Sequence, residues 1–336
     1  MLRSSPFSHS GNTVRAVMND VLLAGSPGVA ACLLIYGWGV ACQLAIVLAV
    51  ALASESAALR WRGRDAAAWH DDHAIVVLAL LLALTLPPYA PWWIGVLAAL
   101  FAVLIGKHAY GGLGTNVFNP AMAGYVFVLV FFPAYTQQWP LVGAPLPGPG
   151  DSIAAVFAGA AGAVDALSGA TALDHMQTNS RLMIMLSEME ATRYLGRIGT
   201  RGVEWINLAF LAGGVYLVLR RRIAWRVPAG MLLALFVTAA LFNGYDPDRY
   251  AGPLFHLFSG ATMIGAFFIA TEPVSGVPTP RGQLCFGAGV GLLTWVVRSW
   301  GVYPDGVAIA IICMNALAPM LHALTQPRLV GGGEAP

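Results

Sequence analysis

Charged side chains are scarce in this sequence. They make up 10% of the 336 residues, whereas hydrophobic residues make up 58%. An ordinary soluble domain has roughly 25% charged residues, so water is not the main solvent around this chain. The formal net charge is only +2, and the arginines are scattered. This pattern excludes a nucleic-acid-binding surface, which needs clustered basic side chains.

Cysteine is also rare. Cys32, Cys42, Cys285 and Cys313 each stand alone in an apolar stretch. Zinc and iron–sulfur sites within one chain usually contain closely paired cysteines, so we predict no metal site formed by this chain alone. We expect the four residues to be small buried hydrophobic side chains. A metal shared with another chain of a complex would draw ligands from both, and the sequence leaves that alternative open.

Long apolar runs take up most of the chain. Residues 73–106 contain no Asp, Glu, Lys or Arg and are interrupted by Pro87, Pro88 and Pro91, which predicts a helical hairpin that crosses a bilayer twice. About 20 mostly apolar residues cross the bilayer core, so the chain can hold about ten such helices. The predicted spans are 20–36, 40–58, 73–87, 92–107, 119–133, 203–220, 227–243, 253–271, 282–298 and 306–325.

Basic residues lie at alternate ends of these spans. Those on the side of the N-terminus are Arg3, Arg15, Arg60, Arg62, Arg64, Lys107, Arg220, Arg221, Arg222, Arg226, Arg281 and Arg328. Short cytoplasmic loops carry an excess of Lys and Arg, so we predict that both termini are cytoplasmic and that residues 134–200 face outward. Arg298 departs from the pattern, as do the arginines of 181–201, where the rule loses force in a long segment.

This parity divides the chain into three parts. They are an N-terminal membrane half (1–133), an outward segment (134–200) and a C-terminal membrane half (201–336). Five spans in each half would make any structural repeat one of inverted topology, as in many transport proteins. The predicted fold is an all-α polytopic membrane protein of about ten transmembrane helices, with two inverted five-helix halves as an open alternative.

A run of small residues occurs within the outward segment: Asp165-Ala166-Leu167-Ser168-Gly169-Ala170-Thr171. Such a run lets a backbone approach a bulky ligand closely. On chemistry alone a plain loop explains it as well, because a threonine hydroxyl is unreactive without an activating partner. The run resembles the Asp-x-x-Ser/Thr-Gly-Ala-Thr site at which a flavin transferase joins FMN, through its phosphate, to the last threonine. Each defined position matches.

Three further stretches carry a family resemblance. Residues 110–125 (Tyr-Gly-Gly-Leu-Gly-Thr-Asn-Val-Phe-Asn-Pro-Ala-Met-Ala-Gly-Tyr), 5–12 and 260–276 resemble the D subunit of the Rnf electron-transport complex, and the resemblance covers nearly the whole chain. A relative with the same architecture is the B subunit of the sodium-pumping NADH:quinone oxidoreductase. That subunit tends to carry a longer N-terminal extension, so the short start here favours the Rnf subunit.

The resemblance implies a membrane flavoprotein subunit of a translocase, with no catalytic residue of its own. FMN would be bound covalently at Thr171, where Asp165 would assist the transferase and Ser168, Gly169 and Ala170 would complete the site. Noncovalent riboflavin occurs in some members. The implied partners are Rnf subunits A, B, C, E and G, one of them a second FMN-bearing subunit, together with the flavin transferase and the lipids of the bacterial inner membrane. Sodium and proton both remain open as the coupling ion.

Ionisable or polar groups within apolar spans are candidates for an ion path, because they cost free energy there. Glu55 and Glu272 qualify, and Asp20 is weaker; each could instead snorkel or cap a helix end. Asn119 with Pro120 indicates a broken helix whose freed backbone lines a cavity.

The chain contains an internal control for the flavin motif. Ser259-Gly260-Ala261-Thr262 repeats its last four letters, but His256 replaces the acid and the eighth predicted span encloses the threonine. We therefore expect no modification at Thr262 and expect the small residues to allow close helix packing. A solute channel or carrier without a redox role is the main competing function, and modification of Thr171 distinguishes the two.

Overall fold

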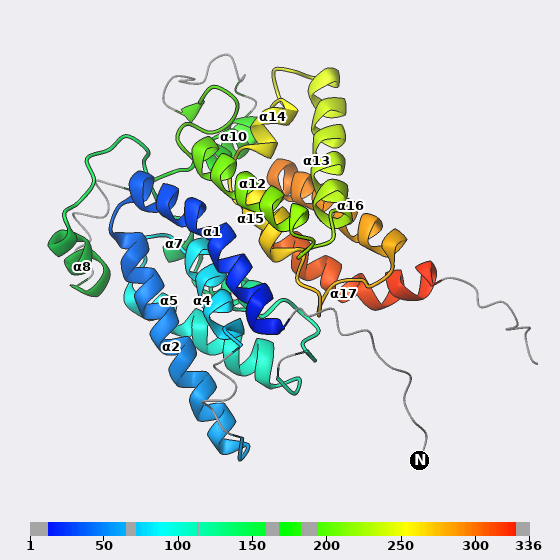
Figure 1. Ribbon diagram of the computed structural model, residues 1–336. Coiled ribbons are helices and arrows are strands. Elements are labelled where there is room, and N and C mark those ends of the chain that lie inside the picture. The colour runs from blue at the N-terminus through cyan, green and yellow to red at the C-terminus, as the bar shows by residue number, and fades with distance from the viewer. Residues whose placement is uncertain are drawn as a thin grey trace, which may run out of the picture.

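The computed structural model describes residues 13–64, 72–112, 114–158, 168–182, 184 and 194–326. Helices dominate it (Figure 1). They are α1 (Val14–Tyr36), α2 (Gly39–Trp61), α4 (Ala74–Thr85), α5 (Trp92–Leu100), the π-helix η1 (Phe101–His108), α6 (Pro120–Phe131), α7 (Pro133–Thr136), α8 (Pro149–Ala158), α10 (Ala172–Leu182), α12 (Val203–Leu219), α13 (Arg226–Tyr245), α14 (Pro253–Leu257), α15 (Thr262–Ile264), the π-helix η3 (Gly265–Ile269), α16 (Pro280–Trp300) and α17 (Val307–Thr325).

Helices occupy all ten ranges that the sequence predicts as spans. Four of them, α1, α2, α13 and α17, are long and apolar enough to cross a membrane by length and composition. The other ranges hold shorter, interrupted or less apolar helices. The structure therefore agrees with a polytopic membrane protein, while the number of ten crossings stays a prediction.

The eighth predicted span is not one continuous helix. In place of a helix over 253–271, α14 ends at Leu257, and α15 begins only at Thr262 before continuing as η3. Gly260 between them has φ +57°, a left-handed conformation that glycine adopts readily. Hydropathy did not predict this break, because residues 258–261 contain no charged residue and do not interrupt the apolar run.

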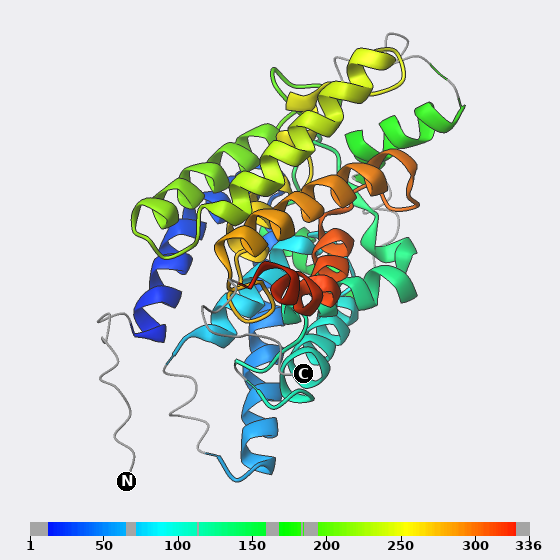
Figure 2. The ribbon, with the colours of Figure 1, turned by 90° about the vertical axis from the view of Figure 1, so that its right-hand side faces the viewer.

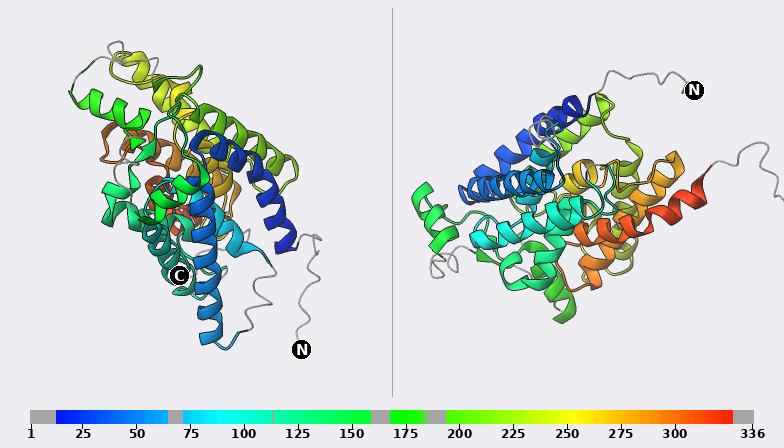
Figure 3. Two further views of the ribbon diagram at one scale, coloured as in Figure 1. Left: turned by 90° about the vertical axis from the view of Figure 1, so that its left-hand side faces the viewer. Right: turned by 90° about the horizontal axis from the view of Figure 1, so that it is seen from below.

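Within each membrane half, helices at corresponding positions in chain order pack on one another. In the first half α2 packs on α4 and α5, and α6 packs on η1; in the second, α13 packs on α14 and α16, and α17 packs on α16. Contacts across the halves join α1 to α12 and α6 to α17. Figure 3 shows the halves side by side in the view from below. Two related halves would give this pattern, and the inverted repeat itself stays a prediction.

Large apolar side chains lie exposed on the outer faces of the helices. Leu34, Leu219 and Leu241 are 79%, 77% and 68% exposed, an arrangement that water would disfavour and lipid accepts. Cys285 and Cys313 are exposed as well, Cys42 is half-buried and Cys32 is buried. The expectation that all four cysteines are buried was therefore wrong for two of them, because they face outward from α16 and α17.

Glycine allows α1 and α12 to approach closely. A Cβ added at Gly213 would lie 2.0 Å from the carbonyl oxygen of Ala24. We therefore expect Gly213→Ala to force the helices apart and to cost about 1–3 kcal/mol, seen as a lower midpoint of thermal unfolding in detergent. Gly244→Ala is the matched control, since nothing lies within 4 Å of its added Cβ. Equal midpoints for the two variants would contradict this account of the packing.

Between the halves, the described part of residues 134–200 forms short helices and two short strands. Strands β1 (Trp139–Pro140) and β2 (Ser168–Gly169) pair antiparallel, with Trp139 opposite Gly169. The figures place α10 and α14 at the end opposite the start of α1 and the end of α2 (Figures 1 and 2). This arrangement agrees with the predicted placement of residues 134–200 on the side of the membrane opposite the termini. That placement stays a prediction.

Candidate flavin site

Thr171 lies directly before α10, at its N-terminus. Its hydroxyl oxygen accepts a hydrogen bond from the backbone N–H of Asp174 at 3.2 Å, and its carbonyl oxygen accepts one from His175 at 2.9 Å. This is the N-cap arrangement for which threonine is well suited. The side chain is half-buried. The end of the motif therefore has a local structural role as well as the predicted chemical one.

The other motif residues approach Thr171 along β2. Gly169 pairs with Trp139, and a Cβ added to it would meet Leu141 at 2.9 Å. A larger residue here would require the Leu141 side chain to move, so glycine suits this packing independently of access for a transferase. Ala170 is exposed, and Ser168 pairs with Pro140 through its backbone. Asp165 lies outside the described residues.

Helix α10 is held in place by the C-terminal end of α16. The buried Gln177 amide donates to the carbonyl oxygens of Val297 and Arg298, each at 3.1 Å, and Arg181 donates to that of Gly301. Carbonyls at a helix end lack partners within the helix, and the Gln177 amide supplies one to Arg298, while the Val297 carbonyl also accepts the backbone N–H of Gly301 at 2.8 Å. Thr171 is thereby positioned by the second membrane half.

We expect Gln177→Leu to loosen α10. The substitution keeps the approximate size but removes the donor, and an unpaired buried group costs about 1–3 kcal/mol. Limited trypsin digestion should therefore cut at Arg181 roughly tenfold faster. Gln326→Leu is the control, because the amide of Gln326 bonds His322 at the exposed end of α17. Unchanged cleavage at Arg181 would contradict this role of Gln177.

The loop before α12 is shaped by a buried carboxylate. Glu204, 5% exposed, accepts backbone N–H donors from Arg197, Ile198 and Gly199 at 2.9–3.2 Å. The loop then presents Thr200, whose hydroxyl donates to the hydroxyl of Ser259 at 2.7 Å. The outward segment is thus fastened to the break between α14 and α15.

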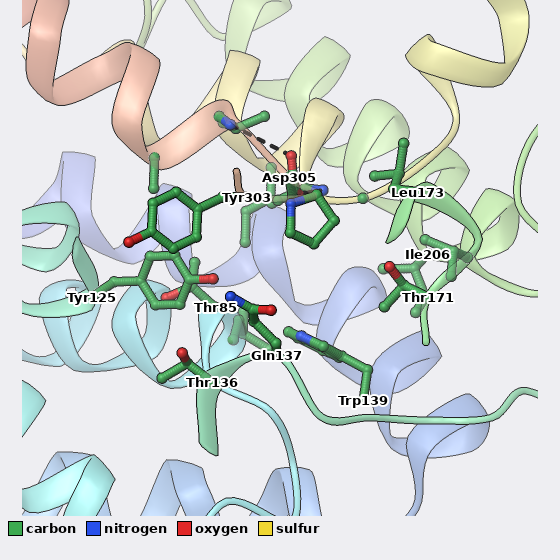
Figure 4. Close-up of a pocket in the computed structure, with 18 of the residues that line it drawn as sticks. Thr85, Tyr125, Thr136, Gln137, Trp139, Thr171, Leu173, Ile206, Tyr303 and Asp305 are labelled. Carbon is green, nitrogen blue, oxygen red and sulfur yellow. Dashed lines mark hydrogen bonds between the residues drawn. The ribbon is translucent and has the colours of Figure 1, made fainter. Parts of the chain in front are cut away.

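A cavity opens beside Thr171 and extends between the two halves. Its volume is about 130 Å³. Residues from the first half, the outward segment and the second half line it, among them Tyr36, Tyr125, Gln137, Trp139, Ile206 and Asp305. Figure 4 shows Thr171 beside Leu173 and Ile206 on one side and Tyr125 on the other, with Gln137 and Trp139 between them. The wall is mainly apolar and aromatic, as in pockets that bind planar ligands.

Several residues of this region were missed by sequence reasoning. Gln177, Glu204 and Asp305 belong to no recognised motif, and their positions depend on contacts distant in sequence. One signal was present: Arg298 breaks the pattern of basic residues. The structure explains this exception, because Arg298 is buried and donates to Asp305 at 2.8 Å.

The second Ser-Gly-Ala-Thr sequence occupies a different environment. Thr262 is fully buried, donates to the carbonyl oxygens of His256 and Ser259, both at 2.9 Å, and accepts from Arg298 at 3.0 Å. A transferase cannot reach this hydroxyl without unfolding the break. Gly260 also provides a backbone turn that lies close to Asp305 and Arg298, a role that the expectation of close helix packing did not include.

The structure brings two of the predicted ion-path residues together. Asn116 donates to Glu272 at 3.0 Å, and Ser275 also donates to it. Asn119 caps α6 and donates its backbone N–H to Asn315 at 3.1 Å, while Asn315 donates to the carbonyl oxygen of Ser275 at 3.0 Å. These five residues form one polar cluster where α6, η3 and α17 meet. Asn119 itself is not among the residues that line the cavity.

Glu55 lies in a separate cluster. Its carboxylate is 2.5 Å from the Lys107 ammonium, and both side chains are almost fully buried. Asp20 also has an ion-pair partner, since Arg222 donates to it at 2.5 Å and so joins α1 to the end of α12. The described residues contain no group of three or more metal-ligating His, Cys, Asp or Glu side chains.

Comparison with known proteins gives a consistent family. The model of the NQR2, RnfD, RnfE family matches residues 1–331. The chain is 48% identical over 334 residues to a protein of Pseudomonas aeruginosa (strain UCBPP-PA14) that is named as the D subunit of an ion-translocating oxidoreductase complex. The match covers 99% of this chain and 96% of the relative.

Proteins of the same name from two other bacteria are also similar. That of Ectopseudomonas mendocina is 47% identical over 335 residues, covering 98% of this chain and 95% of the relative. That of Escherichia coli O7:K1 is 42% identical over 344 residues, covering 98% of each. A family match over nearly the whole chain and relatives this similar lead to one conclusion: the chain belongs to the NQR2, RnfD, RnfE family.

Proposed function

We propose that this chain is the D-type membrane subunit of an Rnf-type ion-translocating oxidoreductase complex and carries FMN on Thr171 through a phosphoester. The family and the names of its relatives support membership in such a complex. One structural observation carries the flavin proposal. The threonine of the motif caps a helix at the edge of a cavity that is mainly apolar and lined by aromatic side chains.

The residues around Thr171 fit a phosphate ester. A helix N-terminus favours an anion, because its first backbone N–H groups lack partners and the helix dipole is positive there. Arg201 lines a smaller neighbouring pocket together with Ala170 and Thr171, and so adds a basic side chain close by. The half-buried carboxylate of Asp174 in the first turn repels an anion. The backbone N–H groups and Arg201 must therefore attract the phosphate more strongly than Asp174 repels it.

The lining of the cavity suits the planar ring system of a flavin. Tyr36 and Trp139 lie with ring centroids 5.5 Å apart on its wall, and Thr136 and Gln137 add hydrogen-bonding groups. Bound FMN would supply an isoalloxazine ring that accepts and releases electrons. The chain's own residues would hold it: Thr171 as the attachment point, α10 as the support, and the apolar wall as a barrier to water.

Coupling to ion movement is proposed for the polar cluster of Asn116, Asn119, Glu272, Ser275 and Asn315. Buried polar groups at helix breaks are typical of ion sites in transport proteins. Glu55 remains a further candidate for the path.

The remaining assignments follow from the family and the distribution of charge. We infer an inner-membrane location with both termini cytoplasmic and residues 134–200 external. In that orientation the flavin would exchange electrons with a second, externally placed FMN-bearing subunit among the partners A, B, C, E and G, after attachment by a flavin transferase. Riboflavin is proposed as a second, noncovalent flavin, without an assigned site.

The direct test is in-gel flavin fluorescence of the denatured chain after coexpression with the flavin transferase, followed by mass mapping. Trypsin leaves residues 108–181 as one peptide, so a second protease is needed to isolate Thr171. An FMN phosphate adduct on Thr171 is the expected result. Its absence would reject the flavin proposal and favour a channel or carrier that uses the same cavity.

A further inference from the structure

Asp305 is the only charged residue among the described residues that line the cavity. The rest of the wall is apolar or aromatic, with a few hydroxyl and amide groups such as those of Thr85, Thr136 and Gln137. Figure 4 shows Asp305 above the cavity, across from Trp139. In such surroundings a single charge acts strongly on its neighbours, because little water screens it.

Both carboxylate oxygens of Asp305 have hydrogen-bond donors. Its Oδ1 atom accepts from the Arg298 guanidinium at 2.8 Å, and its Oδ2 atom accepts from the backbone N–H of Ala261 at 2.7 Å. Donors and a nearby cation both stabilise a carboxylate. Asp305 and Arg298 therefore form an ion pair whose acidic member lies at the cavity wall.

The carboxylate, and not the guanidinium, borders the cavity. The Asp305 side chain is 27% exposed, whereas that of Arg298 is 1% exposed. Arg298 is also fixed from behind by the carbonyl oxygens of His256 and Ser259, at 2.7 and 3.2 Å. It cannot turn into the cavity without losing these bonds, so a group in the cavity is closer to the negative partner of the pair.

We propose that Asp305 sets the reduction potential of the flavin carried on Thr171, and this inference rests on the proposed function. Reduction by two electrons and one proton gives the anionic reduced form of the isoalloxazine ring, which carries one more negative charge than the oxidised ring. A fixed anion at the cavity wall opposes the added negative charge. Asp305 thus holds the potential below the value that the same cavity would give without it.

The test is a spectroelectrochemical titration of the purified chain with its covalent flavin. Dithionite supplies the electrons, water supplies the protons, and absorbance reports the oxidised ring. For Asp305→Asn we expect at least a tenfold higher ratio of reduced to oxidised flavin at a fixed potential, a shift of about 30 mV for a two-electron couple. Asp305→Glu keeps the charge and should change the ratio much less. Asp246→Asn removes an equal charge outside the cavity lining and should leave the ratio unchanged.

If Asp305→Asn does not fold, a second variant that leaves the Asp305–Arg298 ion pair intact tests the effect of charge at the cavity wall. Gln137→Glu places a second carboxylate on the cavity wall, and we expect at least a tenfold lower ratio. An unchanged ratio in the folded Asp305→Asn or in Gln137→Glu, with flavin still attached, would overturn the inference alone. Absence of covalent flavin from the unaltered chain would instead overturn the proposed function.

Discussion

Replacing Thr171 by alanine is expected to remove all covalent flavin from this chain. A phosphoester needs the hydroxyl oxygen, which alanine lacks. The substitution also removes the N-cap bond to Asp174, which costs about 1 kcal/mol. Because the other anchors of α10 remain, the chain should insert and fold. In-gel fluorescence normalised to the amount of chain measures the loss.

Two variants make this result specific. Thr171→Ser keeps the hydroxyl and the cap, so it should retain some covalent flavin and a fully formed α10. Thr262→Ala alters the same four-letter sequence at its buried copy, and we expect full fluorescence with lower thermal stability, since its hydroxyl bonds His256, Ser259 and Arg298. Fluorescence that persists in Thr171→Ala, or disappears in Thr262→Ala, would reject the assignment.

Breaking the Glu55–Lys107 pair should have the largest effect on stability. The two groups lie 2.5 Å apart with side chains 2% and 5% exposed, and the His108 imidazole is 3.9 Å from the same carboxylate oxygen. Lys107→Met would leave Glu55 buried without its cation. Removing one partner of a buried ion pair costs about 3–5 kcal/mol, so the midpoint of thermal unfolding in detergent should fall sharply.

The double variant Glu55→Gln with Lys107→Met separates stability from transport. Replacing both partners removes the unpaired charge, and such replacements are often neutral or stabilising, so most of the lost stability should return. A double variant as unstable as Lys107→Met would contradict this. If a complex that contains the double variant translocates ions normally, the role of Glu55 is structural. A stable complex that does not translocate ions would keep Glu55 as a candidate for the ion path.

The positions of the helices could be predicted because they depend on local composition. An apolar run of sufficient length forms a helix in lipid, where every backbone N–H and C=O must find a partner within the segment. This reasoning was correct for α1, α2, α13 and α17. It was wrong over 258–261, where the backbone groups are satisfied by Asn207, Arg298 and Asp305, none of which is a neighbour in sequence.

The candidate site divides in the same way. The sequence predicts Thr171 as the attachment point because an enzyme that recognises a short motif requires consecutive residues, and these are visible in a single stretch. Sequence alone also selected Glu55, Glu272 and Asn119, because a polar residue in an apolar run is conspicuous. It assigned them to one path, whereas the structure places Glu55 beside Lys107 and the other two in the polar cluster of α6, η3 and α17.

By itself, then, the sequence determined the membrane character, the approximate helices, the family resemblance and the threonine of the motif. Each of these depends on composition or on residues that are adjacent along the chain. Only the tertiary structure decided which side chains share the cavity with Thr171, which buried charges are paired, and where the eighth helix breaks. Those outcomes depend on contacts between helices of both halves, and neither hydropathy nor a short motif specifies contacts between residues that are distant in sequence.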